Sequence, residues 1–131
     1  GYMAAAGLTL TQEDHADRAV NCALEMILEV QHFNLDHQLH FSLRAGIDSG
    51  VITAGIIGRK KFSYDIWGNA VNRASRMEST GVENKVQITQ ETYDALQHKE
   101  SYNITESKEK GVKGIGRLKT YIVESTTKQL I

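Results

Sequence analysis

The 131 residues are enough for one domain with a buried core, and neither the 40% hydrophobic nor the 24% charged fraction fits a disordered chain. The formal net charge of −1 gives no overall attraction to nucleic acid or to an acidic membrane surface, so any anion must be bound locally. No apolar run approaches the ~20 residues that cross a bilayer, and a single cysteine excludes a disulfide framework and favours a reducing compartment.

The chain is expected to begin in a strand and continue into a long helix. Residues 2–10 read as a buried strand with no turn before it, which predicts that the fold starts upstream. Apolar residues at helical spacing predict a helix over residues 13–33, with Thr11 as its N-cap. Cys22 lies within this helix, and we expect it to be a small core residue.

Three strands are predicted next, separated by polar turns. Residues 34–38 read as a polar connection, and the turn at residues 48–50 should join the first two strands into a hairpin. A basic turn at residues 58–61 leads into the third strand. The predicted strands cover residues 40–47, 51–57 and 62–66.

The second half of the chain alternates between helices and strands. Thr89 is placed to cap the second of its two helices, and Gly81 follows the end of the first. The predicted helices cover residues 69–78 and 90–96, and the predicted strands cover residues 85–89, 101–106 and 117–124, with a loop over residues 108–116. This order argues for an α+β domain (an α/β sandwich) over residues 1–124, with one layer of helices on a mostly antiparallel sheet, and for a tail over residues 125–131.

Asp65 is the first candidate for substrate recognition. It stands between Tyr64 and Ile66, so the pleat of a strand should point it away from these apolar neighbours. An ionised carboxylate only accepts hydrogen bonds, so it suits the exocyclic amino group of adenine and repels the carbonyl oxygen of guanine. The alternative is an ordinary surface aspartate at a strand end.

Asn72 and Arg76 are expected to share one face of the helix at residues 69–78, because four positions separate them. An amide and a guanidinium beside Asp65 can hold a phosphate at one end and a base at the other. The alternative is a solvated helix face without a ligand.

Lys113 lies in a glycine-rich loop that can bring a cation and backbone amides against a phosphate. Its glycines precede a strand, so they form neither a dinucleotide fingerprint nor a phosphate-binding loop of the nucleoside-triphosphatase type, and a solvated hairpin lysine is the alternative. The five histidines show no metal-ligand spacing, and covalent catalysis has no candidate nucleophile. A reaction at this site would be driven by positioning and electrostatics.

The segment from Tyr64 to Gly81, which reads YDIWGNAVNRASRMESTG, closely resembles the signature of the class III nucleotidyl cyclases. The resemblance covers most of the chain. It continues in the segments YMAAAG at residues 2–7, LRAGIDSGVITAGIIG at residues 43–58, VQIT at residues 86–89, GVKG at residues 111–114 and LKTY at residues 118–121. The start of the chain looks most like the second catalytic half of the membrane-bound adenylyl cyclases.

This resemblance implies a ferredoxin-like domain that forms a head-to-tail dimer, homomeric or heteromeric, with the nucleotide in the cleft between two such domains. The positions implied to bind substrate are Asp65, Ile66, Trp67, Asn72, Arg76 and Lys113. Asp65 matches the residue that reads the adenine amino group. Asn72 and Arg76 match the catalytic pair that orients the ribose and stabilises charge on the reacting phosphate, and Lys113 matches the lysine that contacts the terminal phosphates.

The resemblance further implies an adenylate cyclase that converts ATP to cyclic AMP and pyrophosphate in the cytoplasm, as the cytosolic part of a membrane protein. The family's metal-binding aspartates precede the first residue of this chain, so the domain is expected to be truncated at its N-terminus. We expect it to be inactive alone and to receive Mg²⁺ or Mn²⁺ through missing residues or a partner domain. In membrane-bound relatives, the region matching residues 31–42 helps to receive a stimulatory G-protein subunit.

Two other functions remain open at this point. The first is a guanylate cyclase with the same fold, against which the carboxylate of Asp65 argues. The second is a cyclase-homology module that only dimerises or regulates. The joint presence of Asp65, Asn72, Arg76 and Lys113 argues against such a module, which would need none of them.

Overall fold

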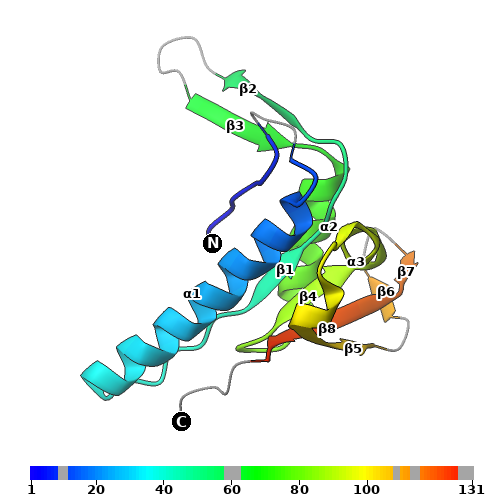
Figure 1. The fold of residues 1–131 in the computed structure, drawn as a ribbon. Helices are drawn as coiled ribbons and strands as arrows, with labels where there is room; N and C mark the ends of the chain where they lie inside the picture. Colours follow the sequence, from blue (N-terminus) through cyan, green and yellow to red (C-terminus); the bar gives the residue numbers. More distant parts are fainter. Residues whose placement is uncertain (9–11, 58–62, 108–109, 113–115, 127–131) are drawn as a thin grey trace.

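A mixed four-stranded sheet forms the centre of the computed structural model, which describes residues 1–8, 12–57, 63–107, 110–112 and 116–126. The strand order is β1 (Ala45–Ile47), β4 (Val86–Thr89), β8 (Thr120–Ser125) and β5 (Tyr102–Glu106) (Figure 1). β1 runs parallel to β4, whereas β4 with β8 and β8 with β5 are antiparallel. The α+β class and the mostly antiparallel sheet are therefore confirmed.

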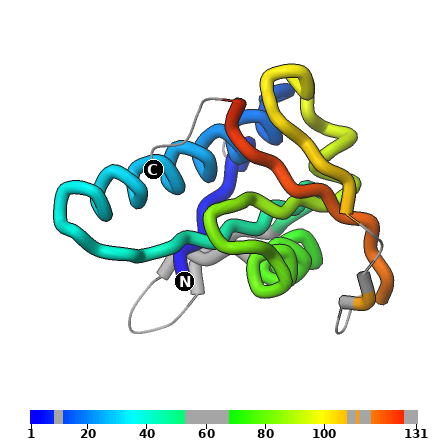
Figure 2. Tube along the Cα trace, turned by 90° about the horizontal axis from the view of Figure 1, so that it is seen from below, coloured from blue at the N-terminus to red at the C-terminus, as the bar shows by residue number. Residues whose placement is uncertain are grey.

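Helices cover both faces of this sheet, which corrects the expectation of a single helical layer. Figure 2 shows α1 (His15–His37) on one side of the strands and α2 (Asn69–Ser79) on the other. The reason lies in β4, whose four residues are all buried. Val86 and Ile88 join the apolar core with α1, while Gln87 on the opposite side donates a hydrogen bond to the carbonyl of Met77 in α2.

α1 is longer than predicted, because the polar residues 34–37 continue the helix. It ends at Gln38, which adopts a left-handed conformation with φ 55°. The Asn34 side chain fixes the returning chain by hydrogen bonds of 2.7 and 3.0 Å to the backbone of Phe41. The N-cap is Asp14 and not Thr11, which lies outside the described residues, and Cys22 is exposed and not in the core.

The hairpin predicted from residues 40–57 does not form. β2 (Thr53–Ile57) pairs with β3 (Ser63–Trp67), with Gly55 opposite Asp65, and this hairpin extends away from the main sheet (Figure 1). β1 is only three residues long and pairs with β4 instead. Alternation identified the second and third strands, but it predicted the first over residues 40–47, where only residues 45–47 form a strand. Pairing is a non-local property that alternation does not encode. The basic turn at residues 58–61 lies outside the described residues.

The N-terminal strand predicted at residues 2–10 is also absent from the part of it that is described, residues 2–8. Tyr2 and Met3 are 79% and 51% exposed, and no described strand lies alongside them to complete the ladder. The apolar residues of this segment therefore have no partner strand among the described residues.

Most of the remaining elements follow the prediction closely. α3 (Gln90–Ala95) begins where expected, and Thr89 caps it by accepting a hydrogen bond from the Thr92 N–H at 3.3 Å. A short 3₁₀ helix, η1 (Lys99–Ser101), then leads into β5. Part of the predicted loop at residues 108–116 is β6 (Lys110–Val112), which pairs with β7 (Gly116–Leu118). The single strand predicted at residues 117–124 is therefore wrong, because its residues are divided between β7 and β8, which belong to different sheets. Among the described residues, no helix has the length and apolarity needed to cross a bilayer.

Candidate functional site

α2 starts immediately after β3, and the sharp turn between them depends on Gly68. This residue is the N-cap of α2 and has φ 140°, a conformation that favours glycine. Its carbonyl accepts the first helical hydrogen bond from the Asn72 N–H at 3.2 Å. The strand that carries Asp65 and the helix that carries Asn72 and Arg76 are therefore joined by a single residue.

The side of α2 that carries Asn72 and Arg76 faces solvent, and both residues are exposed. Ala70 and Met77, at 8% and 0% exposure, form the buried side of the same helix. Within the described part of the chain, neither the Asn72 amide nor the Arg76 guanidinium makes a hydrogen bond or an ion pair. Asn72 and Arg76 therefore lie on the same exposed face of α2, as predicted. We call these two residues the outer pair.

Asp65, Ile66 and Trp67 lie on β3, opposite Gly55, Ala54 and Thr53 of β2. Their backbone is described but their side chains are not, so the direction in which Asp65 points remains a prediction. Lys113 lies outside the described residues, between β6 and β7. Its predicted phosphate contact also remains a prediction.

Gly46 of β1 forms the surface on which α2 lies. A Cβ atom at this position would meet the Glu78 nitrogen at 2.0 Å and the Ala74 carbonyl oxygen at 2.5 Å. The backbone of α2 can approach β1 this closely only because the residue is glycine. At the far end of the helix, Gln87 donates to the Met77 carbonyl at 3.0 Å and to Thr80 Oγ1 at 2.9 Å.

Sequence reasoning missed a charged cluster at the inner side of α2, which we call the Arg73 bridge and define as Asp48, Arg73 and Glu91. Arg73 Nη2 lies 2.6 Å from Glu91 Oε2, and Arg73 Nε lies 3.5 Å from Asp48 Oδ2. Asp48 had been assigned to a turn, and Arg73 had been assigned no role. The available signal was an arginine directly after Asn72, which helical geometry rotates about 100° away from that residue.

The Asp48 carboxylate is the buried end of this bridge. Its side chain is 1% exposed, and its Oδ1 accepts a hydrogen bond from Thr89 Oγ1. Burial raises the pKa of Asp48 above its usual value, against the opposing effects of the Thr89 hydrogen bond and the Arg73 charge. Neither Asp48 Oδ2 nor Arg73 Nε makes a hydrogen bond to the described residues, so the two face each other as a bare ion pair.

At the exposed end of the bridge, the hydrogen bond from Arg73 lowers the pKa of Glu91. The Glu91 side chain is 48% exposed, whereas that of Arg73 is 23% exposed. No group of three or more His, Cys, Asp or Glu residues in the described part of the chain is arranged to hold a metal ion.

Comparison with known proteins fits this arrangement of fold and site. The family described as the adenylate and guanylate cyclase catalytic domain matches residues 1–125. This chain belongs to that family. It is 41% identical over 129 residues to adenylate cyclase type 9 of Gallus gallus, and 34% identical over 122 residues to the receptor-type guanylate cyclase gcy-28 of Caenorhabditis elegans. Both alignments cover 92% of this chain but only 10% of the relative.

A solved structure gives the same fold. The guanylate cyclase domain of RhGC from Catenaria anguillulae, in complex with GTP, superposes with a TM-score of 0.84 at 34% identity. The match covers 93% of this chain and 66% of that one, so the chain spans only part of each of these relatives. The resemblance to nucleotidyl cyclases is therefore confirmed, and the relatives include cyclases of both substrate classes.

Proposed function

We propose that this chain is part of an adenylate cyclase catalytic domain that forms 3′,5′-cyclic AMP in intracellular signalling. In this reaction the 3′-hydroxyl oxygen of ATP bonds to the α-phosphorus, the bond to the β-phosphate oxygen breaks, and pyrophosphate leaves. The observation that carries the proposal is the outer pair, which presents an amide and a guanidinium without described partners directly after the strand of Asp65.

The catalytic role of the outer pair follows from where charge develops. The reaction places negative charge on the phosphoryl oxygens and the leaving group, and fixed cations and amides stabilise such charge. Arg76 supplies the cation and Asn72 orients the ribose, while Lys113 contacts the terminal phosphates. Family membership supports this assignment, because the region that matches the family, residues 1–125, contains all three residues.

The preference for ATP over GTP rests on Asp65. Its carboxylate accepts a hydrogen bond from the adenine amino group and repels the guanine carbonyl oxygen. Ile66 and Trp67 are proposed to line the same base site. The alternative is a guanylate cyclase, because one of the relatives is a receptor-type guanylate cyclase.

We also propose that the site is completed by a second cyclase domain, identical to this one or different from it. The outer pair lies on an open helix surface and not in an enclosed pocket, so a second surface is needed to surround a nucleotide. The described residues do not fit the Mg²⁺ or Mn²⁺ that the family implies, because they bring no metal-ligand set together. We propose that these ligands come from a partner domain or from other parts of the complete protein.

The test is a comparison of ATP and GTP turnover by the complete cyclase that contains this chain. Asp65→Ser should reduce the ATP over GTP ratio of kcat/KM, and Glu83→Gln, an exposed change on the loop after α2, serves as the control. An unchanged ratio in Asp65→Ser would refute the base-reading role. A preference for GTP in the unaltered enzyme would support the guanylate cyclase alternative.

Nucleotide binding distinguishes catalysis from a purely regulatory role. This domain should bind ATP when it is mixed with a metal-bearing partner domain, and should not turn it over alone. If neither the mixture nor the complete enzyme binds ATP, the result would favour a module that only dimerises or regulates.

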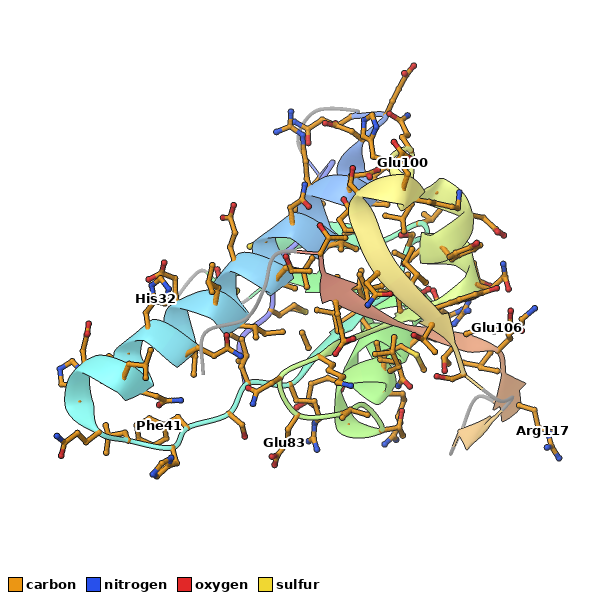
Figure 3. All side chains as sticks on the ribbon, turned by 60° about the horizontal axis from the view of Figure 1, so that its bottom comes forward. His32, Phe41, Glu83, Glu100, Glu106 and Arg117 are labelled. Atoms are coloured by element: carbon orange, nitrogen blue, oxygen red, sulfur yellow. The ribbon has the colours of Figure 1, made fainter. Side chains whose placement is uncertain are left out.

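A G-protein subunit is proposed as a second partner, at the far end of α1. Phe33 and Phe41 are 45% and 59% exposed there, and Figure 3 shows Phe41 on the segment that returns from the helix. This placement assumes that the domain lies on the cytosolic side of a membrane protein. Phe41→Ser should reduce stimulation by the subunit and leave basal turnover unchanged, and unchanged stimulation would exclude this surface.

A further inference from the structure

The Arg73 bridge joins three elements of the fold at the N-terminal half of α2. Asp48 directly follows β1, Arg73 lies in α2, and Glu91 lies in the first turn of α3. Arg73 reaches both carboxylates at once, at 3.5 and 2.6 Å. Neither the substrate contacts nor the metal requirement of the proposed function uses these three side chains.

The Asp48 end of the bridge is a fixed point. Its carboxylate is held by Thr89 Oγ1, and Thr89 is 1% exposed and caps α3. The following residue is held as well, because Ser49 Oγ lies 2.9 Å from Thr92 Oγ1. A buried carboxylate is costly unless a cation pairs with it, so Arg73 is the group that stabilises this arrangement.

The bridge complements the contact at Gly46. The close approach of the α2 backbone to Gly46 fixes the distance between helix and strand. Rotation of the helix about its own axis is opposed at the C-terminal end by the hydrogen bonds from Gln87 to Met77 and Thr80. The side-chain connection from Arg73 to Asp48 and Glu91 lies off this axis and opposes such rotation.

Rotation of α2 matters because the outer pair is on the same helix. Arg73 is adjacent to Asn72 and three positions before Arg76. Any rotation of α2 that breaks the Arg73 bridge also moves the Asn72 amide and the Arg76 guanidinium. Catalysis by positioned charges is sensitive to such shifts, and a displacement of about 1 Å can cost about a hundredfold in rate.

We propose that Arg73 is a positioning residue for the nucleotide site, which holds α2 in the rotation that presents Asn72 and Arg76 to the substrate. The inference rests on the proposed function. Arg73 does not touch the substrate, and acts through Asp48 on one side and Glu91 on the other.

The test uses Arg73→Met, Asp48→Asn and the double variant in the complete cyclase that contains this chain. Arg73→Met alone leaves a buried carboxylate unpaired and should lower the melting temperature. The double variant removes both charges and keeps the Thr89 hydrogen bond, so its melting temperature should return close to that of the unaltered enzyme. Its kcat should still be about tenfold to a hundredfold lower, with little change in KM for ATP.

Arg18→Met is the matched control, because Arg18 forms an exposed ion pair with Asp14 at 3.0 Å on α1. It should change neither kcat nor the melting temperature. Recovery of kcat together with the melting temperature in the double variant would show that Arg73 is only structural, and would overturn the proposal.

Hydrogen exchange of the α2 amides separates this proposal from the proposed function. In the double variant, the amides of residues 72–77 should exchange faster than in the unaltered enzyme, while those of β4 stay unchanged. If Arg76→Ala retains full turnover, the proposed function fails, and faster α2 exchange still supports the positional role of Arg73. Unchanged α2 exchange in the double variant overturns that role.

Discussion

The two arginines of α2 lie one turn apart but have opposite surroundings. Arg76 is exposed, and its guanidinium has no partner among the described residues. Arg73 is 23% exposed and contacts two carboxylates, one of them buried. A free guanidinium on a rigid helix can receive a ligand, whereas one held from two sides can only maintain the structure around it. The comparison thus distinguishes the proposed binding role of Arg76 from the proposed positioning role of Arg73.

The largest effect is expected from Arg76→Ala, which tests the arginine that has no partner among the described residues. Loss of one group that stabilises transition-state charge typically lowers kcat by about 10² to 10³. The melting temperature should not change, because the Arg76 side chain has no partner among the described residues, and the variant keeps the Arg76 carbonyl, which accepts hydrogen bonds from Thr80 and Ser79. The measurement is steady-state turnover of ATP by the complete enzyme, with Ser75→Ala on the exposed side of α2 as the control. Near-normal turnover would contradict the assignment.

Gly46→Ala addresses the surface that both arginines share. The new Cβ would overlap the backbone of α2, which cannot move aside as a side chain could. We expect a loss of about 3 kcal/mol in the free energy of unfolding, measured by urea denaturation of the complete domain. Gly50→Ala is the matched control, because its Cβ would lie at an ordinary 3.5 Å from Ala70. Equal stabilities of the two variants would show that α2 does not depend on close approach at Gly46.

Arg73→Met tests the arginine that contacts the two carboxylates. It leaves the Asp48 carboxylate buried and without its cation, which should cost about 2 kcal/mol of stability. The loss should be smaller than for a fully buried pair, since Arg73 keeps some contact with water. Adding Asp48→Asn to Arg73→Met should restore most of the lost stability in the same denaturation measurement. Failure to recover would place the cost in the lost packing of the arginine stem.

The smallest effect is expected from Glu91→Gln, at the exposed end of the bridge. With Glu91 48% exposed, its pair with Arg73 should contribute about 0.2–1 kcal/mol. The folded-state pKa of Glu91 is lowered from its usual value of 4.5, so this stability is present above pH 4.5 and is lost as the pH falls through the lower pKa. Unfolding measured at neutral and acidic pH should therefore show a difference between variant and unaltered protein that shrinks in acid. A constant difference would argue against the pair.

The pKa of Asp48 is shifted in the opposite direction to that of Glu91. The Asp48 pKa is raised in the folded protein above the usual 3.8, mainly by burial. Its contribution to stability is therefore complete below that value and declines as the pH rises through the raised pKa. The two carboxylates on Arg73 thus respond to pH in opposite directions, which follows from their different exposure.

Local signals predicted much of what surrounds the outer pair. The spacing of Asn72 and Arg76, the stop at Gly81 and the cap at Thr89 all depend on contacts within a few residues, and the structure has these features. The chemistry of the side chains and the resemblance to the cyclases together predict the roles of Asp65 and Lys113, and these two side chains fall outside what the structure describes. The overall class followed from the order of helices and strands.

The sequence by itself determined most of the helices and strands, because periodicity and capping act over a few residues. It did not predict the helical continuation at residues 34–37 or the strand β6. Only the tertiary structure decided that β1 pairs with β4 and β2 with β3, and that helices cover both faces. It also left residues 2–8 without a partner strand in the part of the chain that is described. It alone also brought together Asp48, Arg73 and Glu91. Contacts between residues so far apart in the chain depend on how whole elements pack, and no local pattern records that.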